Sequence, residues 1–187
     1  MRLRNMMFIS LFVAIVAVLG LFPPIPIPFL PIPITLQTFG VILAGAVLGA
    51  RHGGIAMFIF IALIAAGAPL LAGGRGGLGV LFGPSGGYIL GFPVVAFFIG
   101  YATEKITQSL KVWKLILINF LFGVVLMNVL GVTYLSITAE TPWLATALSS
   151  LAFFPGDTIK AVVAAFVTVK LYQVYPINEQ IPKKVAS

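Results

Sequence analysis

The chain has 187 residues, of which 60% are hydrophobic, 12% are aromatic and only 8% carry a charge. A composition this apolar cannot surround a soluble core without exposing large apolar areas, so it predicts an all-α integral membrane protein. The net charge of +7 does not indicate nucleic-acid binding, because the basic residues flank apolar segments, and the absence of cysteine excludes disulfides and thiolate-bound metals.

The apolar runs predict six transmembrane helices in one domain that covers residues 1–187. Each crossing needs about 20 mostly apolar residues. The expected spans are residues 6–22, 35–50, 53–67, 85–103, 112–137 and 157–174. The second and third of these spans are short.

The first span is followed by a segment rich in proline. Six of the 13 prolines lie between Pro23 and Pro33. Proline lacks a backbone N–H and favours extended geometry, so this segment is expected to be an outer loop and not a helix. Irregular backbone is tolerated at membrane depth only against protein or a water-filled cavity, so we expect the loop to fold over the bundle as a lid or plug. Gln37 and Thr38 follow the loop and can face an outer cavity.

A glycine-rich outer loop between the third and fourth spans carries Arg75. The glycines alone are compatible with a tight re-entrant turn. The guanidinium of Arg75 adds a reason to expect a ligand, because its fixed, forked donors suit a carboxylate or phosphate. The loop formally matches GxGxxG, but it lacks the βαβ surroundings of a dinucleotide site, and the chain has no ATP-binding GxxxxGK[ST] motif. Tyr88 begins the fourth span beside this loop.

The fifth span contributes one polar candidate, Asn128. A helix rises about 1.5 Å per residue, so Asn128 lies about 21 Å above Lys114, in the outer half of the membrane. An interhelical hydrogen bond is an equally compatible role for this side chain. Asn119 lies deeper and on another face, and it is not expected at the same site.

The sixth span opens with Asp157 and Lys160. Ionisable groups at membrane depth are costly, and by default they mark a binding or transport site. Their spacing places both side chains on one face of a helix, where they can point into one cavity. The alternative is structural: Asp157 caps the helix and complements its dipole, and Lys160 only neutralises it.

The distribution of basic residues predicts that both termini are cytoplasmic, because basic residues concentrate on the inner side of membranes. The residues expected on that side are Arg2, Arg4, Arg51, Lys105, Lys111, Lys114, Lys183 and Lys184. Arg75 and the Asp157–Lys160 pair are then expected on the outer side.

Three segments together carry a resemblance to a known family: residues 33–39, residues 83–92 and residues 154–160. They read PITLQTF, GPSGGYILGF and FPGDTIK, and Ser85 stands where threonine is expected, which retains the hydroxyl. The chain closely resembles the BioY family, the biotin-specific substrate-binding (S) components of energy-coupling factor (ECF) transporters.

The resemblance implies a six-helix protein of the bacterial plasma membrane that captures biotin with high affinity at the outer face for ATP-driven uptake. It implies a transmembrane scaffold protein and two cytoplasmic ATPases as partners, no cofactor, no metal, and no enzymatic activity of the chain itself. Biotin has a ureido group with two N–H donors and a carbonyl, an apolar sulfur ring, and a chain that ends in a carboxylate.

The resemblance also suggests roles for the candidate residues. Asp157 and Asn128 would accept from the ureido group, and Arg75 would attract the carboxylate. Lys160 would pair with Asp157 or reach a ligand oxygen. Tyr88 would supply part of the apolar wall. The expected substrate-binding residues are thus Asp157, Lys160, Asn128, Arg75, Tyr88 and Gln37.

In this family the scaffold docks on small residues of the first helix, which correspond here to Ser10, Ala14 and Ala17. Close helix approach depends on such residues. Packing of the same residues against the protein's own bundle is an equally compatible reading.

Two other functions are weighed against biotin capture. The chain could be an S component for a different vitamin, with the same bundle and partners. It could also be an intramembrane serine protease of the rhomboid type, with Ser85 as nucleophile and His52, the only histidine, as base. The predicted topology places these two residues on opposite faces of the membrane, so they could not share a proton.

Overall fold

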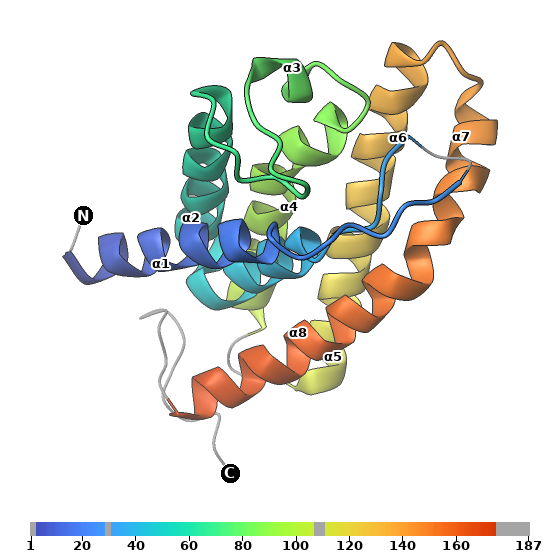
Figure 1. The fold of residues 1–187 in the computed structure, drawn as a ribbon. Coiled ribbons are helices and arrows are strands. Elements are labelled where there is room, and N and C mark those ends of the chain that lie inside the picture. Colours follow the sequence, from blue (N-terminus) through green and yellow to red (C-terminus); the bar gives the residue numbers. More distant parts are fainter. Residues whose placement is uncertain (1–2, 29–30, 107–110, 175–187) are drawn as a thin grey trace.

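A computed structural model describes residues 3–28, 31–106 and 111–174, which form a bundle of helices with no strand in these ranges (Figure 1). The helices are α1 (Leu3–Leu19), α2 (Gln37–Ala65), α3 (Leu78–Leu81), α4 (Gly86–Lys105), α5 (Val112–Ile118), the π-helix η2 (Asn119–Leu126), α6 (Met127–Thr138), α7 (Trp143–Ser150), the 3-10 helix η3 (Leu151–Phe153) and α8 (Phe154–Val174). The predicted all-helical architecture is confirmed.

Four helical segments of the described chain are long and apolar enough to cross a membrane. They are Gln37–Ala65, Gly86–Lys105, Val112–Thr138 and Trp143–Val174, while the apolar helix α1 is shorter. The predicted spans at 85–103 and 112–137 correspond to the second and third of these segments.

The predicted spans at 35–50 and 53–67 form one helical segment with a sharp kink at Gly49. The backbone of Gly49 has φ 82°, in the left-handed region that glycine adopts without steric cost. A kink frees backbone groups that must find other partners. The Ala50 N–H donates to the Glu104 carboxylate of α4 at 3.0 Å, and the Tyr172 hydroxyl of α8 donates to two carbonyls of the preceding turn at 2.6 and 3.1 Å. The kink is therefore held by two neighbouring helices.

The last span begins earlier than the predicted residue 157. The helical segment runs from Trp143, and α8 itself begins at Phe154. Pro155 is compatible with the first turn of a helix because the N–H that it lacks has no helical partner there. Asp157 consequently lies inside the first turn of α8.

The proline-rich segment folds back on itself and lies over the bundle. Ile25 and Ile34 exchange two backbone hydrogen bonds of 2.9 Å. Ile27 and Ile32 are buried in a small cluster with Leu135 of α6. Figure 1 shows the segment running from the end of α1 towards α6 and α7. Ile27 and Ile32 are thus covered by protein, whereas Ile25 stays exposed.

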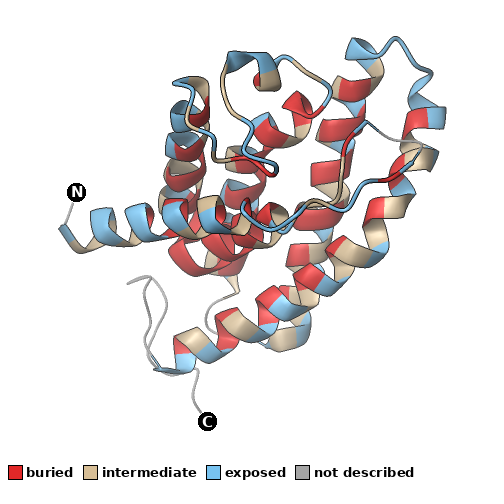
Figure 2. Cartoon of the chain, viewed as in Figure 1, coloured by how far each residue is buried: buried red, intermediate tan, exposed pale blue. Residues whose placement is uncertain are grey.

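The core lies between α2, α4, α6 and α8, whose buried sides face the interior in Figure 2. α4 packs against both α2 and α6. Phe60 of α2 and Phe92 of α4 are stacked, with ring centroids 6.4 Å apart. Phe92 also lines the cavity described below, so the core extends directly into the candidate site.

Candidate ligand-binding site

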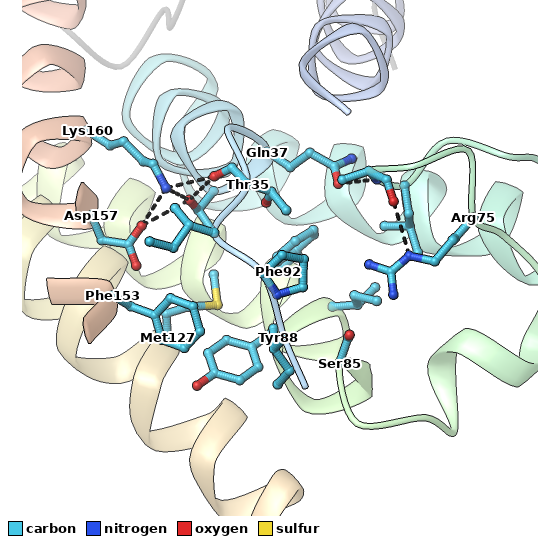
Figure 3. A pocket seen from close by; sticks show the side chains of 17 residues that line it. Thr35, Gln37, Arg75, Ser85, Tyr88, Phe92, Met127, Phe153, Asp157 and Lys160 are labelled. Carbon is cyan, nitrogen blue, oxygen red and sulfur yellow. Dashed lines mark hydrogen bonds and ion pairs between the residues drawn. The ribbon is translucent and has the colours of Figure 1, made fainter. Parts of the chain in front are cut away.

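A cavity lies where the proline-rich loop, the start of α2 and the glycine-rich loop meet α4, α6 and α8 (Figure 3). Small-molecule sites are mostly apolar, with a few polar groups that orient the ligand. The polar residues that line this cavity are Thr35, Gln37, Thr38, Arg75, Ser85, Tyr88, Asp157 and Lys160.

A buried ion pair stands at one end of the cavity. The Lys160 Nζ atom lies 2.7 Å from Asp157 Oδ1, and the two residues are only 8% and 6% exposed. Nζ also donates to the Thr35 carbonyl at 2.7 Å and to the Thr38 hydroxyl oxygen at 3.0 Å. An ammonium group has three donors, and all three are engaged here. Lys160 therefore has no donor left for a ligand in this arrangement.

Asp157, in contrast, keeps one oxygen available. Its Oδ1 accepts from Lys160 and lies 3.3 Å from the Thr38 hydroxyl, which can also donate to it. Among the described residues, none donates to Oδ2 (Figure 3). None of the hydrogen bonds found for this carboxylate comes from a backbone N–H, so the capping alternative does not account for its contacts. The free oxygen is a fixed acceptor that faces the cavity.

The local sequence explains why the pair sits at this point. Asp157 lies in the first turn of α8, where the partial positive charge of the helix N-terminus favours a carboxylate. Lys160 follows one turn later on the same face. Thr35 and Thr38, which complete the lysine's contacts, flank the start of α2.

Arg75 stands at the opposite end of the cavity from the ion pair (Figure 3). The glycine-rich loop holds it through backbone bonds between Leu71 and Arg75 of 3.0 and 3.3 Å. Its Nε donates to the Ala72 carbonyl at 3.1 Å. Within the described chain, its two terminal nitrogens have no hydrogen-bond partner. They are thus available to an anion, which a guanidinium can bind with two parallel hydrogen bonds.

An apolar wall joins the two charged ends. It consists of Met127, Phe92, Phe153 and the ring of Tyr88, together with isoleucines of the proline-rich loop. The rings of Tyr88 and Phe153 meet edge to face, with centroids 5.8 Å apart. The ring of Tyr88 lies directly against Gly131 of α6, where a side chain would collide with it. The cavity can therefore hold a flat apolar body between an acceptor and a cation.

The structure brings together five of the six residues that the sequence singles out, because Asp157, Lys160, Arg75, Tyr88 and Gln37 all line the cavity. The sixth, Asn128, does not line it.

The Asn128 side chain instead lines a separate crevice next to α7, and its Nδ2 donates to the Val124 carbonyl of the preceding turn at 2.9 Å. The expectation that Asn128 points into the same cavity is therefore corrected. The helical rise gave its depth, but the face on which it lies depends on the π-helix that precedes it. Nor is this bond the interhelical one expected as the alternative. Met127, its neighbour, faces the cavity instead.

Comparison with known proteins identifies the family of the chain. The model of the BioY family matches residues 1–177 of the chain. The chain belongs to the BioY family.

Two relatives illustrate the similarity of this BioY-family chain to other members. A probable biotin transporter BioY of Bacillus subtilis is 39% identical over 179 residues, which cover 96% of each chain. A biotin transporter BioY of Rhizobium etli is 40% identical over 182 residues, which cover 95% of this chain and 97% of the relative.

A solved structure also resembles the fold. It is the crystal structure of an S-component for biotin from an ECF-type ABC transporter, and it is 37% identical in sequence. It superposes with a TM-score of 0.87 over 89% of each chain. Together with the four long apolar helices, these similarities establish a membrane protein of a transporter family.

Two of the three small residues of α1 lie on the outside of this BioY-family bundle. Ser10 and Ala14 are exposed, whereas Ala17 is half-buried and packs against the core. The helix binds the bundle through Ile9, Phe12, Val13 and Val16. Packing against the protein's own bundle, which the sequence left open, thus applies to Ala17 and not to Ser10 and Ala14.

The residues of the protease alternative are not brought together. Ser85 lines the cavity, whereas His52 follows the kink of α2 and does not line it. The His52 Nε2 atom lies 3.2 Å from Asn5 Nδ2 of α1. The relatives of this BioY-family chain are named transporters, so the protease alternative is set aside.

Proposed function

We propose that this chain binds biotin in the cavity described above and serves as the S component of an ECF-type transporter. The observation that carries the proposal is the free Asp157 oxygen at one end of an apolar cavity that has the Arg75 guanidinium at its other end. Biotin matches this order of groups, because its ureido N–H donors and its carboxylate are separated by an apolar ring and chain.

Each end of the ligand has a proposed contact. Asp157 Oδ2 accepts from a ureido N–H, and the terminal nitrogens of Arg75 bind the carboxylate. Lys160 acts through Asp157, since its own donors are engaged with protein atoms. Tyr88 and Met127 contact the apolar ring. Asn128 has no part in this proposal because it lies outside the cavity lining.

The proposed orientation places the chain in the bacterial plasma membrane as a single domain over residues 1–187. We propose six crossings: α1, the two halves of α2 on either side of Gly49, α4, the α5–η2–α6 segment and the α7–α8 segment. The excess of basic residues in the segments assigned to the inner side supports cytoplasmic termini. Biotin then enters from outside, and the proline-rich loop is its lid.

The partners proposed for uptake are a transmembrane scaffold protein and two cytoplasmic ATPases. The chain has no ATP-binding motif of its own, which supports the proposal that separate ATPases drive uptake. The exposed Ser10 and Ala14 on α1 offer the small surface that close helix packing needs. No cofactor is proposed, and biotin is the small molecule proposed as the ligand.

The proposal is tested with purified protein. Mass spectrometry identifies the small molecule that remains bound after mild purification, and calorimetry then measures the affinity for biotin. Asp157→Asn should lower that affinity about tenfold to a hundredfold, because it removes a charged hydrogen-bond acceptor and points an N–H towards the ligand's own donor.

Glu140→Gln is the matched control, since it neutralises an acid in the turn after α6, away from the cavity lining, and should leave binding unchanged. Native affinity in Asp157→Asn would contradict the assignment of the ureido end. Recovery of a different vitamin would contradict biotin as the ligand.

A further inference from the structure

Gln37 is a buried side chain whose hydrogen bonds all go to backbone. It is 2% exposed. Its Nε2 donates to the Leu70 carbonyl at 3.0 Å and to the Val16 carbonyl at 3.3 Å, and its Oε1 accepts from the Ala72 N–H at 3.3 Å. Both amide donors are thus engaged, and one side chain joins α1, the start of α2 and the glycine-rich loop.

The glycine-rich loop needs such an anchor. Gly73, Gly74 and Gly77 have φ of 79°, 69° and 87°, a conformation that the free chain samples among many others. Fixing each backbone residue costs about 1–2 kcal/mol of conformational entropy, so contacts outside the loop must hold its shape. Within the described residues, the Gln37 amide supplies such contacts at Leu70 and Ala72.

The same contacts lead directly to Arg75. Ala72 donates its N–H to Gln37 and accepts the Arg75 Nε–H through its carbonyl at 3.1 Å (Figure 3). Leu71 adds the two backbone bonds to Arg75. A displacement of the Leu70–Ala72 segment would therefore displace the guanidinium at the end of the cavity.

The end of α1 packs tightly at this junction. A Cβ atom at Gly20 would lie 2.8 Å from Gln37 Nε2 and would collide with the Leu70 carbonyl. The amide is consequently confined between α1 and the loop, and it cannot turn into the cavity without breaking its bonds to both.

We infer that Gln37 is a positioning residue, which fixes Arg75 for the ligand carboxylate by tying the glycine-rich loop to α1 and α2, and that it does not itself contact the ligand. The affinity test of this inference rests on the proposed binding of biotin. It predicts that loss of the Gln37 amide acts selectively on the carboxylate end of the ligand.

The test compares biotin with its methyl ester, which lacks the anionic end, in the Gln37→Met protein. Methionine fills similar space without hydrogen bonds. The affinity for biotin should fall about tenfold, the size of a charge-assisted contact, while the affinity for the ester stays within about twofold. Arg75→Ala should give the same ratio of affinities, and adding Gln37→Met to it should not change that ratio further.

A second measurement is independent of any ligand. Amide hydrogen exchange in the loop segment 70–77 should become about tenfold faster in Gln37→Met, because the anchoring hydrogen bonds are lost. Thr103→Val is the matched control, since Thr103 is buried in α4 and bonds only within its own helix. It should change neither the affinities nor the exchange of the loop.

Two results would overturn the inference: equal losses of affinity for biotin and its ester, or unchanged exchange in the loop. Failure of the unmodified protein to bind biotin is a different outcome. It would overturn the proposed function, and the exchange measurement would still decide whether Gln37 anchors the loop.

Discussion

The role of Lys160 can be tested by removing its charge. Asp157 is only 6% exposed in the unmodified protein, and Lys160→Met leaves its carboxylate with the Thr38 hydroxyl as its one remaining hydrogen-bond partner among the described residues. Breaking a buried ion pair by removing one partner costs about 3–5 kcal/mol. In a chain of this length, each kcal/mol of lost unfolding free energy lowers the melting temperature by about 2–4 °C. The variant should therefore melt about 6–20 °C lower than the unmodified protein. Thermal unfolding in detergent, followed through tryptophan fluorescence, measures the shift.

The double variant Asp157→Asn, Lys160→Met separates stability from binding. It carries no uncompensated buried charge, so it should recover most of the lost melting temperature. It should bind biotin no more tightly than Asp157→Asn alone, because both lack the charged acceptor.

A cycle of the two substitutions decides whether the lysine contacts the ligand. If Lys160 acts only through Asp157, Lys160→Met should weaken biotin binding in the unmodified protein and have little effect once Asp157 is already Asn. An equally large loss in both backgrounds would refute this reasoning and place the ammonium on the ligand itself.

Three further predictions concern other parts of the fold. Gly131→Ala should push the ring of Tyr88 out of its position and weaken biotin binding, and this effect should disappear when Tyr88 is already replaced by Ala. Biotin affinities of the unmodified protein, the two single variants and the double variant test this prediction. If Gly131→Ala weakened binding just as much without the Tyr88 ring, the ring would not be the cause. Ala14→Leu on the exposed face of α1 should abolish biotin uptake in cells but leave biotin binding unchanged. Met7→Leu, at another exposed position of α1, is the control and should change neither. Loss of biotin binding in Ala14→Leu would show that Ala14 is needed for folding and not only for docking. Tyr172→Phe should cost about 1–3 kcal/mol by leaving two carbonyls at the kink without this donor, which lowers the melting temperature by about 2–12 °C. Its biotin affinity should be unchanged, and a loss of affinity would show that the kink and the cavity are coupled.

The sequence predicts well that the chain is helical, but it predicts less well where each helix begins and ends. Continuous apolar runs determine that the chain is helical, because a helix alone satisfies its backbone within one segment in a membrane. Local rules place breaks where Pro and Gly occur. The break predicted between residues 50 and 53 lies close to the kink at Gly49, whereas Pro155 lies inside the first turn of α8. Whether such a residue ends a helix depends on neighbours that satisfy the freed groups, as Glu104 and Tyr172 do here. Those neighbours are distant in sequence.

The residues of the candidate site could also be predicted only in part. Asp157 and Lys160 are recognisable because two charges one turn apart are rare in an apolar chain, and Arg75 is recognisable for its isolation. Asn128 was expected at the cavity because its depth follows from helical rise, but its face does not, since a π-helix precedes it. Met127 could not be identified in advance, because an apolar residue in an apolar span carries no signal of its own.

The energetics of the Asp157–Lys160 pair argue for binding over stability. Two charges removed from water lose about as much solvation free energy as their attraction returns, and apolar residues of similar volume often serve the fold equally well. A pair retained only for stability would also have no reason to leave one carboxylate oxygen without a donor. Here the lysine and Thr38 engage Oδ1 alone, which fixes the direction of Oδ2 before any ligand arrives. A preorganised acceptor spares the ligand the cost of ordering it, so the pair is best explained as a means of holding one oxygen in place.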